Sequence, residues 1–429
     1  TGSSLETVDL ETAYLQADYQ EEGAYIELPE CTFAYMPSEW IERITEAKQS
    51  GDGRVCFPVL RALYGLQRSG YDFITAFQET LLARGWTRAP NDHSLFMRWV
   101  DGHLALLVNY VDDLLVAIPN PQVGEKIWGE IRGDWRADPQ AASSRFLGCV
   151  IKQVSGHTIL EQTEYVTSLR SKVEATAGFS LKARDKLPDI PHHTLLLDAE
   201  EGKCPTRDRS ALGALMYVAR GTRPDINRAV HYLCTCVTKW TNHHTAMLLD
   251  VIAYTDTVKL GIKYAAPPDV RETWDLWECW LHTDATHTAP VSNSGRTVFI
   301  RHPLHNLRWV IDWASHKQVY ATLSSAESEI VALVAGVREA VGWQALQEAT
   351  RRNPQGDNPQ GTAKLHVRCD NRAAVIAASR GWSKALAHMT RCYGVSVHWL
   401  FQRIEAGECD LAFVGTHHNA ADALTKIIN

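Results

Sequence analysis

Long apolar runs are absent from this chain of 429 residues: no stretch of about 18 uncharged apolar residues occurs, so no transmembrane helix is expected. The first ten residues, TGSSLETVDL, hold no basic segment, no apolar segment and no initiator Met, so we expect a chain cut from something longer. The ten cysteines lack C-x-x-C spacing, which argues against a zinc module or a disulfide framework and favours reduced thiols inside a cell.

An excess of positive charge is also absent. The formal net charge is −7, whereas a dedicated nucleic-acid-binding protein is usually basic. Clustered carboxylates lower such a total, and binding depends on local patches, so this balance weighs against nucleic-acid binding without excluding it. The hydrophobic fraction of 45% and the charged fraction of 22% are those of ordinary globular proteins, and the length suffices for two or three domains.

What is present is a pair of adjacent aspartates inside an apolar, β-prone stretch, LALLVNYVDDLLVAI at residues 104–118. Ionised carboxylates in a buried strand are destabilising unless a positive group compensates them. Asp112 and Asp113 therefore indicate either the tip of a β-hairpin, where Asp suits the turn, or a site for a divalent cation, which binds carboxylate oxygens.

Acids beside apolar runs recur along the chain. Singly, each has another explanation, because an Asp can end a strand or cap a helix and a Glu can be an exposed helix position. Their repetition in two groups favours convergence at strand ends, an arrangement that holds two Mg²⁺ about 4 Å apart for in-line phosphoryl displacement. The acids are Asp9, Asp112 and Asp113 in the first group, and Asp284, Glu329, Asp370 and Asp422 in the second.

The hydrophobic pattern also changes along the chain. Residues 8–150 alternate β-like runs, such as AYIELPE, with helical ones, such as YDFITAFQETLLARGW at 71–86. Residues 155–270 are mostly helical, and the helices predicted there are EYVTSLRSKVEATA (164–177), SALGALMYVARG (210–221) and DINRAVHYLCTCVTKW (225–240). Beyond residue 275 strands and helices alternate again, with a helix expected near 325–349. The stretch near 265–275, with AAPPDVRET, is expected to be a linker.

Eight sequence blocks follow one another along the chain: VDLETAYLQADYQEEGAYIELPE, RALYGLQRSG, YVDDLLVAI, FLG, LGALMYVARGTRPDINRAV, TLSSAESEIVAL, CDN and ADALTK. They stand in the order found in copia-type (Pseudoviridae) LTR retrotransposon polyproteins. From about residue 8 to residue 426 the chain resembles the reverse transcriptase and ribonuclease H region of such a polyprotein. The resemblance implies an α+β and α/β multidomain fold. It comprises a polymerase palm with an antiparallel sheet and helices (1–153), a helical thumb or connection (154–270) and a ribonuclease H-like mixed-sheet domain (275–429).

In the palm, the resemblance implies that Asp9 and Asp112 are catalytic and bind two Mg²⁺, with Asp113 as a catalytic helper. Tyr14 would exclude the 2′-hydroxyl of a ribonucleotide; an ordinary core tyrosine is the alternative. The segment LYGLQ would contact the incoming nucleotide, and the tripeptide FLG, which is also common in protein cores, would form the primer grip. The nucleotide-binding residues would then be Tyr14, Gly65 and Gln67, and those of the primer grip Phe146, Leu147 and Gly148.

In the second half, the resemblance implies a two-metal ribonuclease H site. Glu329 is preferred to Glu327 because, in the family, the second acid of E-x-E leads the apolar helical run. His417 or His418 would assist proton transfer or product release, with a solvated surface pair as the alternative. The catalytic metal ligands would be Asp284, Glu329, Asp370 and Asp422, and the residues contacting the hybrid Asn371, Arg391 and His418.

Three departures from the family pattern bear on activity. The family has a fingers region before the first catalytic acid, and this sequence starts eight residues before Asp9, so we expect weakened polymerisation by this fragment. The family's Thr-Lys-His-Ile-Asp is TRCYG at 390–394, which keeps a cation at Arg391 but loses the His and the Asp. QADY replaces the usual Asn-Gly turn after the first palm block, which changes a turn and leaves the chemistry intact.

The resemblance thus implies an RNA-directed DNA polymerase (a nucleotidyltransferase) and a ribonuclease H endonuclease, each with two Mg²⁺ that Mn²⁺ could replace. The implied partners are an RNA template, a DNA primer, the RNA/DNA hybrid and dNTPs, with integrase as a further polyprotein product. No membrane is involved, and the expected location is a cytoplasmic particle or the nucleus.

Other interpretations stay open. A host could have retained a truncated copy as a nucleic-acid-binding scaffold without catalysis, or the ribonuclease H could be active beside a silent polymerase. An unrelated metal-dependent nuclease would explain the second group of acids but neither YVDD nor LYGLQ.

Overall fold

The protein forms two compact units, residues 2–143 and residues 144–429, and each is considered by itself below. The structure is a computed structural model, and it describes residues 3–50, 55–154, 156–190, 201–266, 273, 276–288, 291–351 and 363–427. Most of the predicted linker at 265–275 lies outside these residues. The division into three domains stays a prediction.

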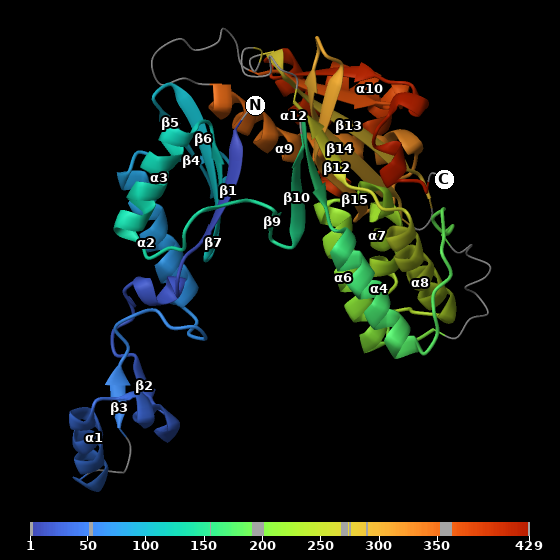
Figure 1. The fold of residues 1–429 in the computed structure, drawn as a ribbon. Helices are drawn as coiled ribbons and strands as arrows, with labels where there is room; N and C mark the ends of the chain where they lie inside the picture. The colour runs from blue at the N-terminus through green and yellow to red at the C-terminus, as the bar shows by residue number, and fades with distance from the viewer. Residues whose placement is uncertain are drawn as a thin grey trace. The chain divides into compact units, whose positions relative to one another are not determined.

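The first unit is built on a sheet with strand order β4-β5-β6-β7-β1-β8, in which every pairing is antiparallel. Helices α2 and α3 lie beside this sheet in Figure 1, and they bury their apolar side chains in the same core as the strands. The strands are β1 (Ser4–Asp9), β4 (Thr87–Ala89), β5 (Asp92–Val100), β6 (His103–Tyr110), β7 (Asp113–Ile118) and β8 (Ala141–Ala142), and the helices are α2 (Ser69–Ala83) and α3 (Pro121–Asp134). The predicted helix at 71–86 and the strand pair within 104–118 are confirmed.

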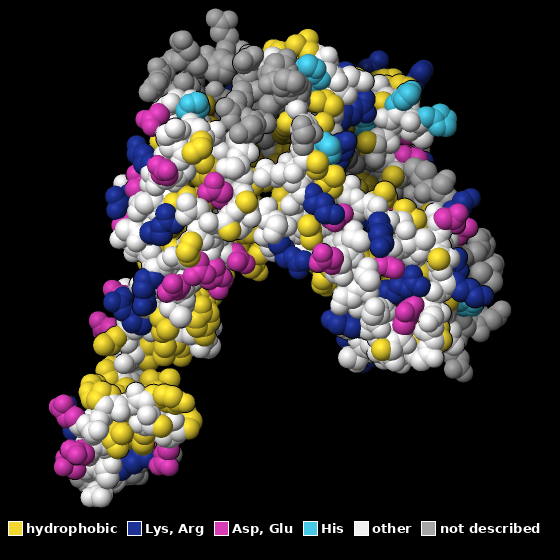
Figure 2. Space-filling view, viewed as in Figure 1, with side chains coloured by type: hydrophobic (Ala, Val, Ile, Leu, Met, Phe, Trp, Pro, Cys, Tyr) yellow, Lys and Arg dark blue, Asp and Glu magenta, His cyan; other side chains and the backbone are white. Residues whose placement is uncertain are grey.

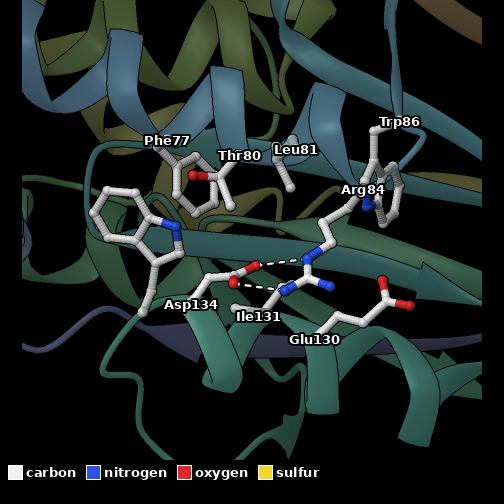
Figure 3. A pocket seen from close by; sticks show the side chains of 9 residues that line it. Phe77, Thr80, Leu81, Arg84, Trp86, Glu130, Ile131 and Asp134 are labelled. Atoms are coloured by element: carbon white, nitrogen blue, oxygen red, sulfur yellow. Dashed lines mark hydrogen bonds and ion pairs between the residues drawn. The ribbon is translucent and has the colours of Figure 1, made fainter.

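Local signals account for α3 and for its packing against α2. The side chain of Asn120 accepts a hydrogen bond from the backbone N–H of Val123 (3.0 Å), and Pro121 occupies the first helical turn, where its missing N–H costs nothing. Between the two helices, Arg84 donates two hydrogen bonds to Asp134 (2.8 and 2.6 Å), as Figure 3 shows. The hollow beside this pair has a volume of about 10 Å³, so it is a packing gap rather than a ligand site.

A smaller part of the first unit pairs β2 (Tyr25–Glu27) with β3 (Cys56–Pro58) and also contains α1 (Ser38–Ser50). The strand predicted from AYIELPE is therefore present, in shortened form.

The second unit begins with a sheet of order β12-β11-β10-β9 and, within its described residues, four helices that share one apolar core. The elements are β9 (Arg145–Phe146), β10 (Cys149–Val154), β11 (His157–Glu161), α4 (Thr163–Ala177), α6 (Thr206–Gly221), α7 (Asn227–Thr235), α8 (Asn242–Thr257) and β12 (Ile262–Ala265). The predicted helical character is confirmed, although one predicted helix is shorter than its pattern: the 3-10 turn η3 (Pro224–Ile226) precedes α7, which ends at Thr235. The sheet was not predicted, because β12 joins β11 across about a hundred residues and such pairing leaves no local pattern.

The remainder of the second unit is a five-stranded mixed sheet of order β15-β14-β13-β16-β17. The pairs β13–β14 and β14–β15 are antiparallel, whereas β13–β16 and β16–β17 are parallel. The elements are β13 (Glu278–Thr286), β14 (Asn293–His302), β15 (Leu307–Lys317), α9 (Ser325–Arg351), β16 (Leu365–Cys369), α10 (Arg372–Arg380), α11 (Met389–Tyr393), α12 (Val397–Glu405), β17 (Cys409–Phe413) and the 3-10 turns η6 (Thr416–His418) and η7 (Asp422–Leu424). This mixed sheet and the antiparallel palm-like sheet confirm the predicted fold class.

On the face shown in Figure 2, Lys and Arg side chains are interspersed with Asp and Glu rather than gathered into one basic stripe. This fits the net charge of −7. Among the described helices, none combines the length and the apolar character that crossing a membrane requires.

Candidate active sites

Three of the predicted ribonuclease H acids converge at one end of the mixed sheet. Oxygen atoms of Asp284, Asp370 and Asp422 all lie within 4.8 Å of one another. The sheet topology explains why Asp284 and Asp370 are close. Strands β13 and β16 are parallel and pair Thr283 with Cys369, so the residues that follow these two, Asp284 and Asp370, lie at the same level of the sheet. Asp422 arrives from η7, which packs against β13 and β14.

Glu329 reaches the same place from the first turns of α9. Its Oε1 accepts a hydrogen bond from the N–H of Ala285 (3.2 Å), and its Oε2 accepts one from the thiol of Cys369 (3.6 Å). The helix can come this close to β13 because Gly336 has no side chain; a Cβ there would lie 2.8 Å from the Thr283 Cγ2. Glu327 points elsewhere, since it accepts hydrogen bonds from the Leu323 N–H and the Ser324 hydroxyl.

The environment of Glu329 and Asp284 disfavours the charged forms of these two acids. Burial, followed by repulsion from Asp284 and Asp370, raises the pKa of Glu329 to about 8. Burial is also the largest cause that raises the pKa of Asp284 to about 6, and repulsion from Asp370 adds to it, while a hydrogen bond from Thr425 opposes it. Buried, mutually repelling carboxylates with converging oxygens are the donor set that a divalent cation satisfies, so these residues fit a metal.

The last residues of the described chain are fastened to β13 by contacts that the sequence did not reveal. The Asn419 side-chain N–H donates to the Thr283 carbonyl (2.9 Å), and the Ala420 N–H donates to the His282 Nδ1 (3.0 Å). Burial first, and then nearby arginines, lower the pKa of His282 to about 4, so its ring is neutral and able to accept. At Gly295 a Cβ would lie 2.9 Å from the Ala421 carbonyl oxygen, so η7 needs a glycine beneath it.

A helix of the preceding segment also supports this site. Arg228, in the first turn of α7, is 8% exposed, and its Nε–H donates to the Thr425 carbonyl (2.9 Å). The Thr425 hydroxyl in turn donates to Asp284. Burial lowers the pKa of the Arg228 guanidinium, and within the described ranges no carboxylate lies at ion-pair distance from it. The motif TRPDINRAV contained this residue, but only the fold places it behind the acids.

The other predicted residues of this half are one helix cap and three exposed side chains. Asn371 follows Asp370 and caps α10, because its side-chain oxygen accepts the N–H of Ala374 (3.0 Å). Arg391 is exposed on α11, and His417 and His418 are both exposed in η6.

In the first unit, the structure brings together the three predicted palm acids. Asp9 ends β1 and pairs across the strands with Asp113, the first residue of β7. Asp112 lies in the hairpin turn, and its carbonyl accepts the N–H of Leu10 (2.8 Å). The turn is unusual because Val111, a β-branched residue, has a φ of 56°, and the buried Asn109 holds it by donating to its carbonyl (2.9 Å).

Charge repulsion is present here too. Burial raises the pKa of Asp9 first, and repulsion from Asp112, Asp113 and Asp138 adds to it; burial and Asp112 raise the pKa of Asp113. In the described part of the chain, two groups of three side chains bring their possible metal-ligating atoms within 4.8 Å of one another, and both groups lie in the second unit. The oxygen atoms of the three palm acids are therefore farther apart than those of the second unit.

Two aromatic rings lie near the palm acids. Tyr14, in η1 (Ala13–Gln16), stacks on Tyr64 with ring centroids 4.4 Å apart and also contacts the buried Phe73 at 5.7 Å. Burial and the negative charge of Asp112 raise the pKa of Tyr64, so this residue of the predicted segment LYGLQ lies within electrostatic reach of the acids. Its neighbours in the chain, Gly65 with a φ of 99° and Gln67, are exposed.

The predicted primer-grip tripeptide forms a tight hairpin turn in the second unit. Phe146 ends β9, and the next two residues, Leu147 and Gly148, both have positive φ (46° and 73°), as a two-residue turn between antiparallel strands requires. The Tyr217 hydroxyl, from α6, donates to the Leu147 carbonyl.

Comparison with known proteins finds a family match for the first part of the chain and similar proteins for most of its length. Residues 2–183 match the family described as "Reverse transcriptase (RNA-dependent DNA polymerase)". The chain is 25% identical over 376 residues to the retrovirus-related Pol polyprotein from transposon RE1 of Arabidopsis thaliana, covering 85% of this chain and 24% of that protein. It is 22% identical over 446 residues to the corresponding polyprotein from transposon TNT 1-94 of Nicotiana tabacum, covering 99% of this chain and 30% of that protein.

One solved structure, the foamy viral protease–reverse transcriptase in complex with RNA/DNA hybrid, aligns with 96% of this chain and 44% of its own at 13% identity and a TM-score of 0.49. The chain spans less than a third of the length of both transposon polyproteins. The sequence matches confirm the resemblance that the motifs indicated: the chain is similar to copia-type retrotransposon polyproteins, and its residues 2–183 match the reverse transcriptase family.

Proposed function

We propose that the mixed-sheet half of the second unit is a ribonuclease H that cleaves the RNA strand of an RNA/DNA hybrid. The observation that carries the proposal is the convergence of Asp284, Asp370 and Asp422 within 4.8 Å, with Glu329 held beside them by Ala285. A bound cation would offset the mutual repulsion of these carboxylates, because each one raises the cost of ionising the others.

Asp284, Glu329, Asp370 and Asp422 would hold two Mg²⁺, with Mn²⁺ as a possible substitute. The ions would supply an activated water and neutralise charge at the scissile phosphate. The protein's own contribution is orientation: the Thr425 hydroxyl fixes Asp284, and the Ala285 N–H fixes one oxygen of Glu329. Asn371 keeps its amide N–H₂ available for a 2′-hydroxyl, because only its oxygen is used in capping α10. The exposed Arg391 and His418 would meet the hybrid's backbone.

We propose RNA-directed DNA polymerisation for the palm. The pairing of Asp9 with Asp113, and the position of Asp112 in the adjoining turn, support a site for two Mg²⁺ held by Asp9 and Asp112. Tyr14 would meet the sugar of the incoming dNTP. Its stacking on Tyr64 supports this role, because a stacked ring is held in one orientation and can exclude a 2′-hydroxyl sterically. The segment with Gly65 and Gln67 would contact the nucleotide, and the turn Phe146–Gly148 the primer.

One pair of assays tests both proposals. Cleavage of a labelled RNA/DNA hybrid in Mg²⁺ is measured for the unaltered protein and for Asp370→Asn, and extension of a primed RNA template for the unaltered protein and for Asp112→Asn. We expect each variant to lose its own activity by a factor of a hundred or more and to keep the other, because the acids lie in different sites. Asp185→Asn is the matched control, since Asp185 is exposed and lies outside both sites.

Failure of cleavage by a folded protein in Mg²⁺ would refute the ribonuclease H, and failure of extension would refute the polymerase. Loss of both, with hybrid binding retained, would favour a nucleic-acid-binding scaffold. Interaction with other polyprotein products such as integrase, and residence in a cytoplasmic particle or the nucleus, belong to the same proposal.

A further inference from the structure

A second hollow lies in the second unit, between α6, α7 and β15. Its volume is about 90 Å³, enough for more than one water-sized group. One part of its wall is apolar, with Trp313 and Val230 among its residues, and no Asp or Glu lines it. The polar side chains on its wall are Arg220, Asn227, His231, Ser315 and His316. We call this hollow the α6–α7–β15 pocket.

Two polar atoms in this pocket have no hydrogen-bond partner among the described residues. The first is the hydroxyl of Ser315, a residue only 4% exposed, and the second is the buried Nε2 of His231. The backbone of Ser315 is fixed, because its N–H donates to the Asn227 side chain (3.0 Å). A buried donor without a partner costs about 1–3 kcal/mol, so such atoms usually meet a ligand or water.

The charge around the pocket is positive. The exposed guanidinium of Arg220 makes no hydrogen bond or ion pair with any described residue. Two acids, Asp312 and Glu339, act electrostatically on His316, and both lie close to the guanidinium of Arg296, at 3.0 and 3.9 Å, which offsets their negative charge. The same Arg296 lies 2.8 Å from the Nε2 of His316, and as an obligate donor it leaves the proton of this ring on Nδ1.

We propose that the α6–α7–β15 pocket binds a phosphate group, with Arg220 at its mouth and the Ser315 hydroxyl and the His231 ring as inner hydrogen-bond donors. A guanidinium, a hydroxyl and an imidazole N–H together match the several acceptor oxygens of a tetrahedral oxyanion. The phosphate can be a free ion or part of a nucleic-acid backbone. The two sources share this chemistry, and the test separates them.

The first arm of the test titrates inorganic phosphate into the full chain, with EDTA present, by isothermal titration calorimetry. We expect Arg220→Gln and Ser315→Ala each to weaken binding about tenfold, which corresponds to ~1.4 kcal/mol. Arg209→Gln is the matched control, because Arg209 is also an exposed arginine on α6 but lies three helical turns away. It should leave the affinity unchanged.

The second arm measures binding of a fluorescent RNA/DNA hybrid by anisotropy in EDTA at several salt concentrations. If the natural ligand is a backbone phosphate, Arg220→Gln weakens hybrid binding relative to Arg209→Gln and lowers the salt slope by about one ion. If phosphate binding depends on the pocket while hybrid binding does not, the source is a free phosphate.

The proposal is overturned if both Arg220→Gln and Ser315→Ala match Arg209→Gln in both arms. Neither arm involves cleavage or extension, so this outcome is distinguishable from a failure of the proposed enzymatic function.

Discussion

Replacing Glu329 by Gln is expected to stabilise the metal-free protein near pH 8 while abolishing ribonuclease H activity. The fold raises the pKa of this carboxyl from 4.5 to about 8. Above pH 4.5 the unfolded chain releases the proton, whereas the folded protein keeps it until about pH 8. The folded state therefore loses stability as the pH rises through this window. At about 1.4 kcal/mol per pKa unit, the loss is on the order of 4 kcal/mol at pH 8.

Gln removes the proton linkage while preserving the shape of the side chain. Its carbonyl oxygen can still accept the N–H of Ala285, and its amide lies where the Cys369 thiol now donates. The assay is thermal unfolding in EDTA, followed by circular dichroism at about pH 5 and about pH 8. The midpoint of the variant should exceed that of the unaltered protein at the higher pH and approach it at the lower. Added Mg²⁺ should narrow the difference, because a bound cation stabilises only the ionised site.

Glu339→Gln provides the control, since Glu339 lies on the same helix and is exposed, so its replacement should change the midpoint little at either pH. A Glu329→Gln variant that is less stable than the unaltered protein at pH 8 in EDTA would refute the reasoning. That result would mean that the carboxylate is compensated in the folded state and is not destabilised by burial and repulsion.

Three further outcomes follow from packing. Gly295→Ala should destabilise the second unit by roughly 1–3 kcal/mol and slow hybrid cleavage, because the new methyl group meets the backbone of η7; denaturant unfolding checks this, and an unchanged midpoint would contradict it. Arg228→Gln should lower the cleavage rate about tenfold with little change in KM, since it loosens Thr425 behind Asp284; an effect confined to KM would contradict a positioning role. Leu147→Asn should raise stability by about 0.5–1 kcal/mol in urea, because Asn tolerates positive φ in a two-residue hairpin turn, and a loss of stability would show that the Leu side chain has a packing role.

The parts of the fold that could be predicted are those with local signals. The apolar alternation on both sides of Asp112 and Asp113 predicted two strands and a turn, and the structure has β6 and β7 there. Helical spacing likewise predicted α2, α4, α6 and α9. The helix predicted at 225–240 is longer than the observed α7, which ends at Thr235. The apolar pattern continues past Thr235, although the backbone leaves the helix there.

The parts that could not be predicted depend on contacts between distant residues. Thr425 and Asp284 are 141 residues apart, and Asn419 is 136 residues from the Thr283 carbonyl that it holds. No periodicity records such a pairing. The role of Arg228 is hidden for the same reason, because its partner Thr425 lies 197 residues away.

The sequence by itself determined which residues carry carboxylates and which short segments form helices and strands, since both depend on neighbours along the chain. It also determined the resemblance to retrotransposon polyproteins, because the order of the motifs is a property of the sequence. Only the tertiary structure decided that Asp284, Asp370 and Asp422 meet within 4.8 Å and that Glu329 holds its proton to about pH 8. The physical reason is that burial and repulsion between charges depend on distances in space, which arise when parallel strands, a helix and a terminal turn pack together.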